Sequence, residues 1–176
     1  MNEIIKKNGI MFGTVIGLIS VLTTTLIYSI DLKLFTSWWI GVLNILIYIS
    51  ISIYLLVKTK KDLNGIFPFK SAFTTYFISV VIGILISTVF NIILFNYIDP
   101  AAKDTIKELT IKFAVEMMEK FNSPTEVVNQ AIKDMQANDQ FAVGPLLKGA
   151  VFSILFSSVF GLLLAAIFKS KTVENL

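Results

Sequence analysis

Four long apolar stretches constrain the fold of this chain more strongly than any other feature of its sequence. They are residues Gly9–Ile30, Trp38–Val57, Ala72–Ile98 and Leu146–Phe168. A helix that crosses a bilayer needs about 20 apolar residues, and the only charge inside these stretches is Lys148, near the start of the fourth. A soluble bundle with very apolar helices is the alternative, and the missing charges disfavour it. The sequence therefore predicts an all-α integral membrane protein with four transmembrane helices, built as one domain over residues 1–176.

The lysines outside these stretches predict how the helices are oriented. Lys6 and Lys7 precede the first stretch, four lysines lie in the second connection (KTKKDLNGIFPFK), and Lys169 and Lys171 follow the fourth stretch. The first connection, DLKLFTS, contains only Lys33. Because short lysine-rich loops remain in the cytoplasm, both termini are expected to be cytoplasmic. The first stretch is too long for the core of a secretion signal and is expected to stay in the membrane.

The third connection, residues 99–145, is large enough to fold and is expected on the outer face. Its apolar residues recur every three or four positions, which predicts amphipathic helices over about 100–121 and 124–137. These helices are too small to hold a core of their own, so their apolar faces must rest on each other, on lipid or on a partner. Acids slightly outnumber lysines here, whereas helices that bind anionic lipid are usually basic. The favoured interpretation is a self-packed cap over the bundle.

Short motifs mark where both of these helices should begin. Asp99 fits the N-cap of the first helix, with Pro100 at its first position. Ser123 fits the N-cap of the second, followed by Pro124 at the first position and Glu126 as the partner in a capping box. Asp99 is therefore expected to form a structural corner between a membrane helix and the insert.

Small residues recur at intervals of four in three of the apolar stretches. This spacing lets helix backbones approach closely in lipid, where no hydrophobic force holds helices together. It supports either a tight oligomer or packing within one chain, and we favour packing within the chain, with the small residues facing inward. The helix-packing candidates are Gly9, Gly13 and Gly17 in the first stretch, Ser79, Gly83 and Ser87 in the third, and Gly149, Ser153, Ser157 and Gly161 in the fourth.

The chain lacks the side chains on which most enzyme and metal sites depend. It contains no His, no Cys and no Arg, which rules out a Ser-His-Asp triad, a cysteine nucleophile and the usual zinc sites. It has no GxxxxGK[ST] or GxGxxG phosphate-binding motif and no basic stripe for nucleic acid. We expect a non-enzymatic protein with no cofactor, no metal site and no nucleic-acid partner.

Polar residues inside the apolar stretches, among them Asn44 and Asn91, leave two interpretations open. Such side chains usually bond to carbonyls of their own helix or to a neighbouring helix, but together they could line a polar path. Proton-coupled transport is disfavoured because no acid, His or Arg lies deep in any stretch. A small transporter or a passive pore therefore stays open as the alternative function.

Several motifs together resemble a known family. They are the glycine-rich first stretch, FPFKSAFTTYF at the start of the third stretch, NYIDP at its end, and the charged helical insert. This layout, over about residues 5–170, is similar to a family of small Bacteroidota membrane proteins known as domain of unknown function 4199. The resemblance implies a location in the bacterial inner membrane and brings no catalytic residues. The association of that family with family-2 glycosyltransferases implies an accessory role in envelope or lipid-linked glycan chemistry.

Small-residue packing, an amphipathic insert and missing catalytic groups predict an interaction or assembly subunit of the membrane. Its expected partners are the lipid bilayer and either another membrane protein or further copies of the chain.

Overall fold

The computed structural model describes residues 2–170. Its α-helices are α1 (Glu3–Ile30), α2 (Trp38–Asp62), α3 (Phe69–Ile93), α4 (Pro100–Lys120), α5 (Thr125–Ala137) and α6 (Val143–Phe168). A 3-10 segment, η1 (Leu32–Thr36), follows α1, and a π-helical segment, η2 (Leu94–Ile98), ends α3. The helices α1, α2, α3 with η2, and α6 are long and apolar enough to cross a membrane. The predicted all-α class is confirmed, and so is the presence of four long helices that are apolar enough to span a membrane.

The long helices run past the apolar stretches into charged sequence. α1 begins at Glu3 because the Asn2 side chain accepts a hydrogen bond of 2.9 Å from the amide of Ile4 and caps the helix there. α2 continues beyond Val57 to Asp62, since lysine is a good helix former. Apolar composition therefore marks the part of a helix that suits the bilayer, not the helix ends.

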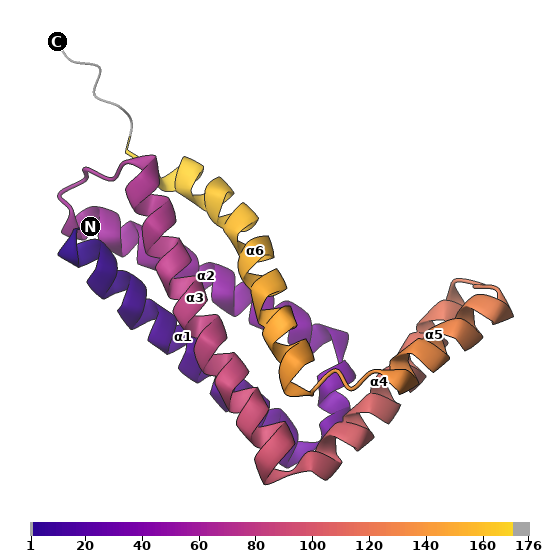
Figure 1. Cartoon of the computed structure of the whole chain (residues 1–176). Helices are drawn as coiled ribbons and strands as arrows, with labels where there is room; N and C mark the ends of the chain where they lie inside the picture. Colours follow the sequence, from indigo (N-terminus) through magenta and orange to yellow (C-terminus); the bar gives the residue numbers. More distant parts are fainter. Residues whose placement is uncertain (1, 171–176) are drawn as a thin grey trace.

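The four long helices form a bundle with two different ends (Figure 1). The start of α1, the connection between α2 and α3, and the end of α6 lie together at what we call the terminal side. The opposite end, which we call the insert side, carries η1, η2 and the start of α4.

The closest pair in the bundle is α1 and α3, whose backbones meet through the glycines of α1. A methyl group added at Gly13 would lie only 2.7 Å from the carbonyl oxygen of Ser79, and one added at Gly17 would lie 2.7 Å from Cβ of Ile86. Gly9 is equally confined against α3. These glycines therefore pack against α3 of the same chain and do not face lipid.

An apolar core closes the terminal half of the bundle. Gly161 of α6 lies directly against the ring of Tyr76, and the amide of Ser170 donates a 2.8 Å hydrogen bond to the carbonyl of Phe67. These contacts tie the end of α6 to α3 and to the connection before it. The core consists of Leu56, Phe67, Ala72, Tyr76, Val80, Leu164 and Ala165.

A polar contact fixes α1 to α2 on the same side. The Asn8 side-chain amide donates to the Thr59 hydroxyl at 3.1 Å and to the Asp62 carboxylate at 2.9 Å. Lys58 completes the group with a 2.7 Å ion pair to Asp62. All four spanning helices are therefore anchored to one another near the chain ends.

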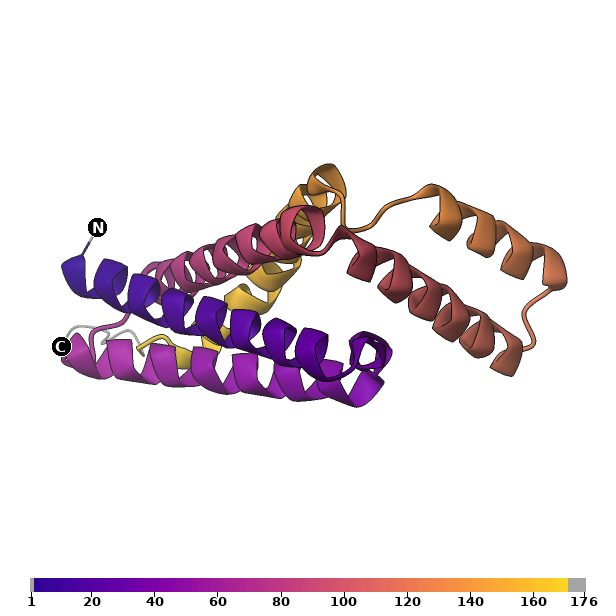
Figure 2. The ribbon, with the colours of Figure 1, turned by 90° about the horizontal axis from the view of Figure 1, so that it is seen from below.

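α4 and α5 pack side by side into a hairpin that we call the arm, residues 100–137. Figures 1 and 2 show the arm leaving the insert side and extending away from the bundle. The two helices pack on each other as expected, but their expected position as a cap over the bundle is wrong. The first turns of α4 touch the bundle, where Ala102 and Ile106 pack with Phe95 and Phe141. Figure 2 shows the rest of α4 extending away from the bundle.

The corner before the arm is built as the IDP motif indicates. The Asp99 carboxylate accepts a 3.1 Å hydrogen bond from the amide of Ala102, with Pro100 at the first turn of α4. It also accepts a 2.8 Å bond from the hydroxyl of Tyr28 on α1. The η2 segment, which the sequence did not indicate, precedes this corner, with the amide of Asp99 donating to the carbonyl of Leu94.

The second arm helix begins differently from the expectation. α5 starts at Thr125, Pro124 occupies the cap position, and no side chain caps the helix. Asn122, in the left-handed region (φ 52°), ends α4, and the amide of Ser123 donates to the carbonyl of Met118. Because Ser123 completes the end of α4 in this way, it does not form the expected capping box with Glu126.

The helix contact at Gly13 can be tested against Gly41 of α2, where an added methyl group meets nothing within 4 Å. We expect Gly13→Ala to destabilise the protein by about 1–3 kcal/mol, the usual cost of overpacking. Gly41→Ala should be neutral or stabilising by up to about 1 kcal/mol, because alanine favours a helix more than glycine does. Unfolding of both purified variants in detergent measures this, and equal stability would contradict the close contact.

Candidate functional site

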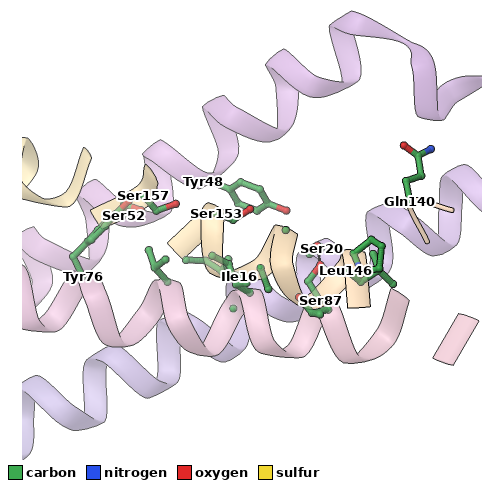
Figure 3. A pocket seen from close by; sticks show the side chains of 17 residues that line it. Ile16, Ser20, Tyr48, Ser52, Tyr76, Ser87, Gln140, Leu146, Ser153 and Ser157 are labelled. Carbon is green, nitrogen blue, oxygen red and sulfur yellow. Dashed lines mark hydrogen bonds between the residues drawn. The ribbon is translucent and has the colours of Figure 1, made fainter. Parts of the chain in front are cut away.

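A cavity of about 510 Å³ lies within the bundle, between α1, α2, α3 and α6. It extends from Tyr76, at the edge of the terminal core, to Gln140 and Leu146 on the insert side (Figure 3). Its volume falls within the range of about 300–1,000 Å³ that is usual for ligand sites. Its polar lining residues are Ser20, Tyr48, Ser52, Tyr76, Ser87, Thr88, Gln140, Ser153 and Ser157.

The cavity exists because the small-residue row of α6 has two different environments. In the terminal half, Gly161 is buried against Tyr76. In the insert half, a methyl group added at Gly149 would meet nothing within 4 Å. Gly149 and Ser153 are exposed although they line the cavity. The cavity is therefore open along α6 on the insert side and closed towards the terminal side.

Side-chain hydrogen bonds join α1 to α3 in the wall of the cavity. The hydroxyls of Ser20 on α1 and Ser87 on α3 are 2.8 Å apart, and the Asn91 amide donates to Ser87 at 3.4 Å. Gly83, one turn away, would place a methyl group 2.8 Å from Ile16. The α1–α3 pair thus forms a closely packed wall, and α2 and α6 form the other sides.

The remaining hydroxyls of the cavity behave differently from many hydroxyls elsewhere in the long helices. Thr25, Ser50 and Ser158 each donate to a carbonyl of their own helix, four residues earlier. Within the described residues, no side-chain hydrogen bond is formed by the cavity hydroxyls Tyr48, Ser52, Thr88, Ser153 and Ser157. These five groups can therefore bond to whatever occupies the cavity.

Charges are confined to the ends of the bundle. None of the described residues that line the cavity is charged. Asp139 directly precedes the lining residue Gln140. It forms a 2.7 Å ion pair with Lys103, and this contact lowers the pKa of the Asp139 carboxyl. Over residues 2–170 no cluster of three or more His, Cys, Asp or Glu could hold a metal.

The polar residues predicted inside the spans do not form one continuous path. Asn44 donates to the carbonyl of Ile40 in its own helix. A smaller cavity of about 230 Å³, lined partly by Asn44, shares Ser20 and Tyr48 with the larger one. On the terminal side of both cavities, the apolar core that includes Leu56, Tyr76 and Leu164 fills the bundle.

The structure separates the predicted helix-packing residues into two groups. Gly9, Gly13, Gly17, Ser79 and Gly161 are buried where helices meet, whereas Ser87, Gly149, Ser153 and Ser157 line the cavity. Gly83 does both, because it packs against Ile16 of α1 and borders the cavity. Four polar residues of the cavity lining were not predicted from the sequence: Ser20, Tyr48, Tyr76 and Gln140. Tyr48 gave no signal because a lone tyrosine in an apolar helix is indistinguishable from a lipid-facing one.

Comparison with protein-family models matches residues 11–170 to the family described as "Protein of unknown function (DUF4199)". The match includes α1 from residue 11 onward, the other three long helices, the arm and the cavity. No curated protein and no solved structure matches the chain.

Cysteine substitution can test whether the cavity is open, since the chain has no Cys of its own. We expect Ser153→Cys to react with a small water-soluble thiol reagent in detergent, because Ser153 is exposed in the cavity. Ser79→Cys should stay unmodified, because Ser79 is fully buried. Mass spectrometry of the labelled protein measures both, and equal protection of the two cysteines would contradict an open cavity.

Proposed function

The chain belongs to the DUF4199 family, and we propose that it is a non-enzymatic integral membrane protein that serves as an interaction or assembly subunit. The observation that carries this proposal is the arm. Its base is held firmly by the bundle, while an apolar face along its length is left uncovered.

The uncovered face lies on α4 and continues to the start of α5. Phe113 is 38% exposed, Phe121 at the tip is 77% exposed and Val127 is 50% exposed. Met117, between the two phenylalanines in the helix, is also exposed. Aromatic residues and methionine are enriched in the centres of protein interfaces. We call these four residues the arm stripe.

The charges beside the arm stripe favour a protein partner over anionic lipid. Glu108, Lys112, Glu116 and Lys120 alternate in sign along α4 at intervals of four. An apolar centre with a mixed polar rim is the usual composition of a protein interface, whereas helices that bind anionic lipid are mainly basic. The proposed partner is another membrane protein that reaches the same side of the bilayer.

Lysine placement supports a bacterial inner-membrane location with cytoplasmic termini. Lys6, Lys7, Lys60 and Lys61 lie in helix ends at the terminal side, and the connection from α2 to α3 leads to Lys70. By the positive-inside rule, this side faces the cytoplasm and the arm faces outward.

A small transporter is the second candidate function, and the cavity favours it. Transport would require the terminal core around Tyr76 and Leu164 to open, because this core closes the bundle on the terminal side of the cavity. The anchoring of α6 at Ser170 and of α1 at Asn8 opposes that opening.

Photo-crosslinking from the arm stripe tests the interaction role. A photoreactive amino acid at Phe121 should capture one defined membrane protein in native membranes, while the same group at the exposed Lys112 should capture it less. Phe113→Glu with Met117→Glu should abolish the capture from Phe121. Because each of these side chains is still more than half buried, thermal unfolding of the double variant serves as the control for its fold.

The products decide between the possible occupants of the arm stripe. A single identified protein, lost in the double variant, supports the proposal. A product with twice the mass of the chain would replace the partner by a second copy, and adducts with lipid alone would contradict the proposed role.

Orientation is tested separately. Lys133→Cys on the exposed side of α5 should react with a membrane-impermeant thiol reagent in intact spheroplasts, while Asn64→Cys in the α2–α3 connection should react only after lysis. The physical reason is the lysine distribution. The reverse labelling pattern would overturn the orientation.

A further inference from the structure

We propose that the insert-side cavity is a binding site for an uncharged membrane amphiphile with ester or hydroxyl oxygens, of which diacylglycerol is the simplest example. This inference does not depend on the arm or on its partner. It rests on the openness of the cavity, on its unbonded hydroxyls and on the absence of charge from its lining.

A molecule of the bilayer can reach the cavity from the side. The cavity lies between helices that are long and apolar enough to cross a membrane. Gly149 and Ser153 line it and are exposed, so it opens along α6. The neighbouring faces of α6 carry exposed apolar residues such as Val151 and Leu155. An acyl chain can therefore leave the cavity and continue directly into lipid.

Two deeply buried hydroxyls supply part of the polar lining of the site, in addition to Ser153 and Ser157. Ser52 is 4% exposed and Thr88 is 9% exposed, and both line the cavity. Neither donates or accepts a side-chain hydrogen bond within residues 2–170. Among the described residues, every side-chain oxygen without accessible surface has a hydrogen-bond partner. Because the Ser52 and Thr88 hydroxyls have no such partner, their oxygens must have some accessible surface, and this surface faces the cavity that they line. In apolar surroundings an unbonded hydroxyl is costly, and ester or hydroxyl oxygens of a ligand would satisfy it.

The lining selects against a charged headgroup. Burying a phosphate requires a paired positive charge, and none of the described lining residues is charged. Lys148 precedes Gly149 in α6 but does not line the cavity. A neutral polar group avoids this desolvation penalty, and hydrogen bonds to Ser52, Ser153 and Ser157 can hold it.

Photolabelling of the full chain in lipid nanodiscs tests the proposal. Photoactivatable diacylglycerol should label peptides of α2 and α6. Unlabelled diacylglycerol should compete with it, and phosphatidylglycerol should not. Gly149→Phe should abolish the labelling, because the site has room for a side chain that would fill the cavity. Val151→Phe, on the exposed face of the same helix, should leave the labelling unchanged.

A second variant tests hydrogen bonding without filling the cavity. Ser153→Ala combined with Ser157→Ala should weaken diacylglycerol competition about 30-fold, since each of the two lost hydrogen bonds is worth roughly a factor of five. Ser153→Leu replaces Gly149→Phe if the latter does not fold.

Labelling that survives in the folded cavity-filling variant would identify ordinary surrounding lipid and overturn the site. Equal competition by phosphatidylglycerol, or unchanged competition in the double alanine variant, would overturn the proposed selectivity. Protection of Ser153→Cys from the thiol reagent by diacylglycerol, but not by phosphatidylglycerol, would support it independently.

Discussion

The close approach of α1 and α3 is the contact on which the rest of the bundle depends. In lipid, helices associate through van der Waals packing and hydrogen bonds rather than through a hydrophobic force. Gly13, with no side chain of its own, allows the backbone of α1 to touch α3 at Ser79. The pair forms a firm wall, against which α2 and α6 are anchored at the terminal side. At Gly149, α6 has no neighbour in contact, and there the α1–α3 pair forms one side of the cavity.

Hydropathy alone predicted the number of spanning helices, because the bilayer imposes one length and one composition on each of them. The small-residue spacing was less informative. Gly149 and Gly161 belong to the same row of α6, yet one faces empty space and the other touches Tyr76. A glycine in the sequence indicates only that this position of the helix has no side chain. What fills the vacated space depends on the bulk and angle of a partner helix, which spacing within one helix does not encode.

The arm shows a similar division between what was predicted and what was not. Periodicity identified its helices, and the IDP motif identified the corner at Asp99. The apolar face of α4, however, serves two purposes: Ile106 is buried in the base, while Phe113 and Phe121 are exposed further along. A repeat in sequence identifies an apolar face without stating what covers it. The two helices do not cap the bundle, because α4 packs against it through Ala102 and Ile106 at its base and then extends away from it.

The π-helical segment η2 has a consequence for how this chain can vary. A π turn accommodates one more residue than an α turn, and each residue of an α-helix rotates the chain by about 100°. The extra residue is taken up within the turn, so loss of a single residue between Leu94 and Ile98 would restore a regular α turn and leave Asp99 facing Tyr28. Loss of a second residue would rotate Asp99 by about 100° and break its contact with Tyr28. The direction of the arm therefore tolerates the loss of one residue in η2 but not of two.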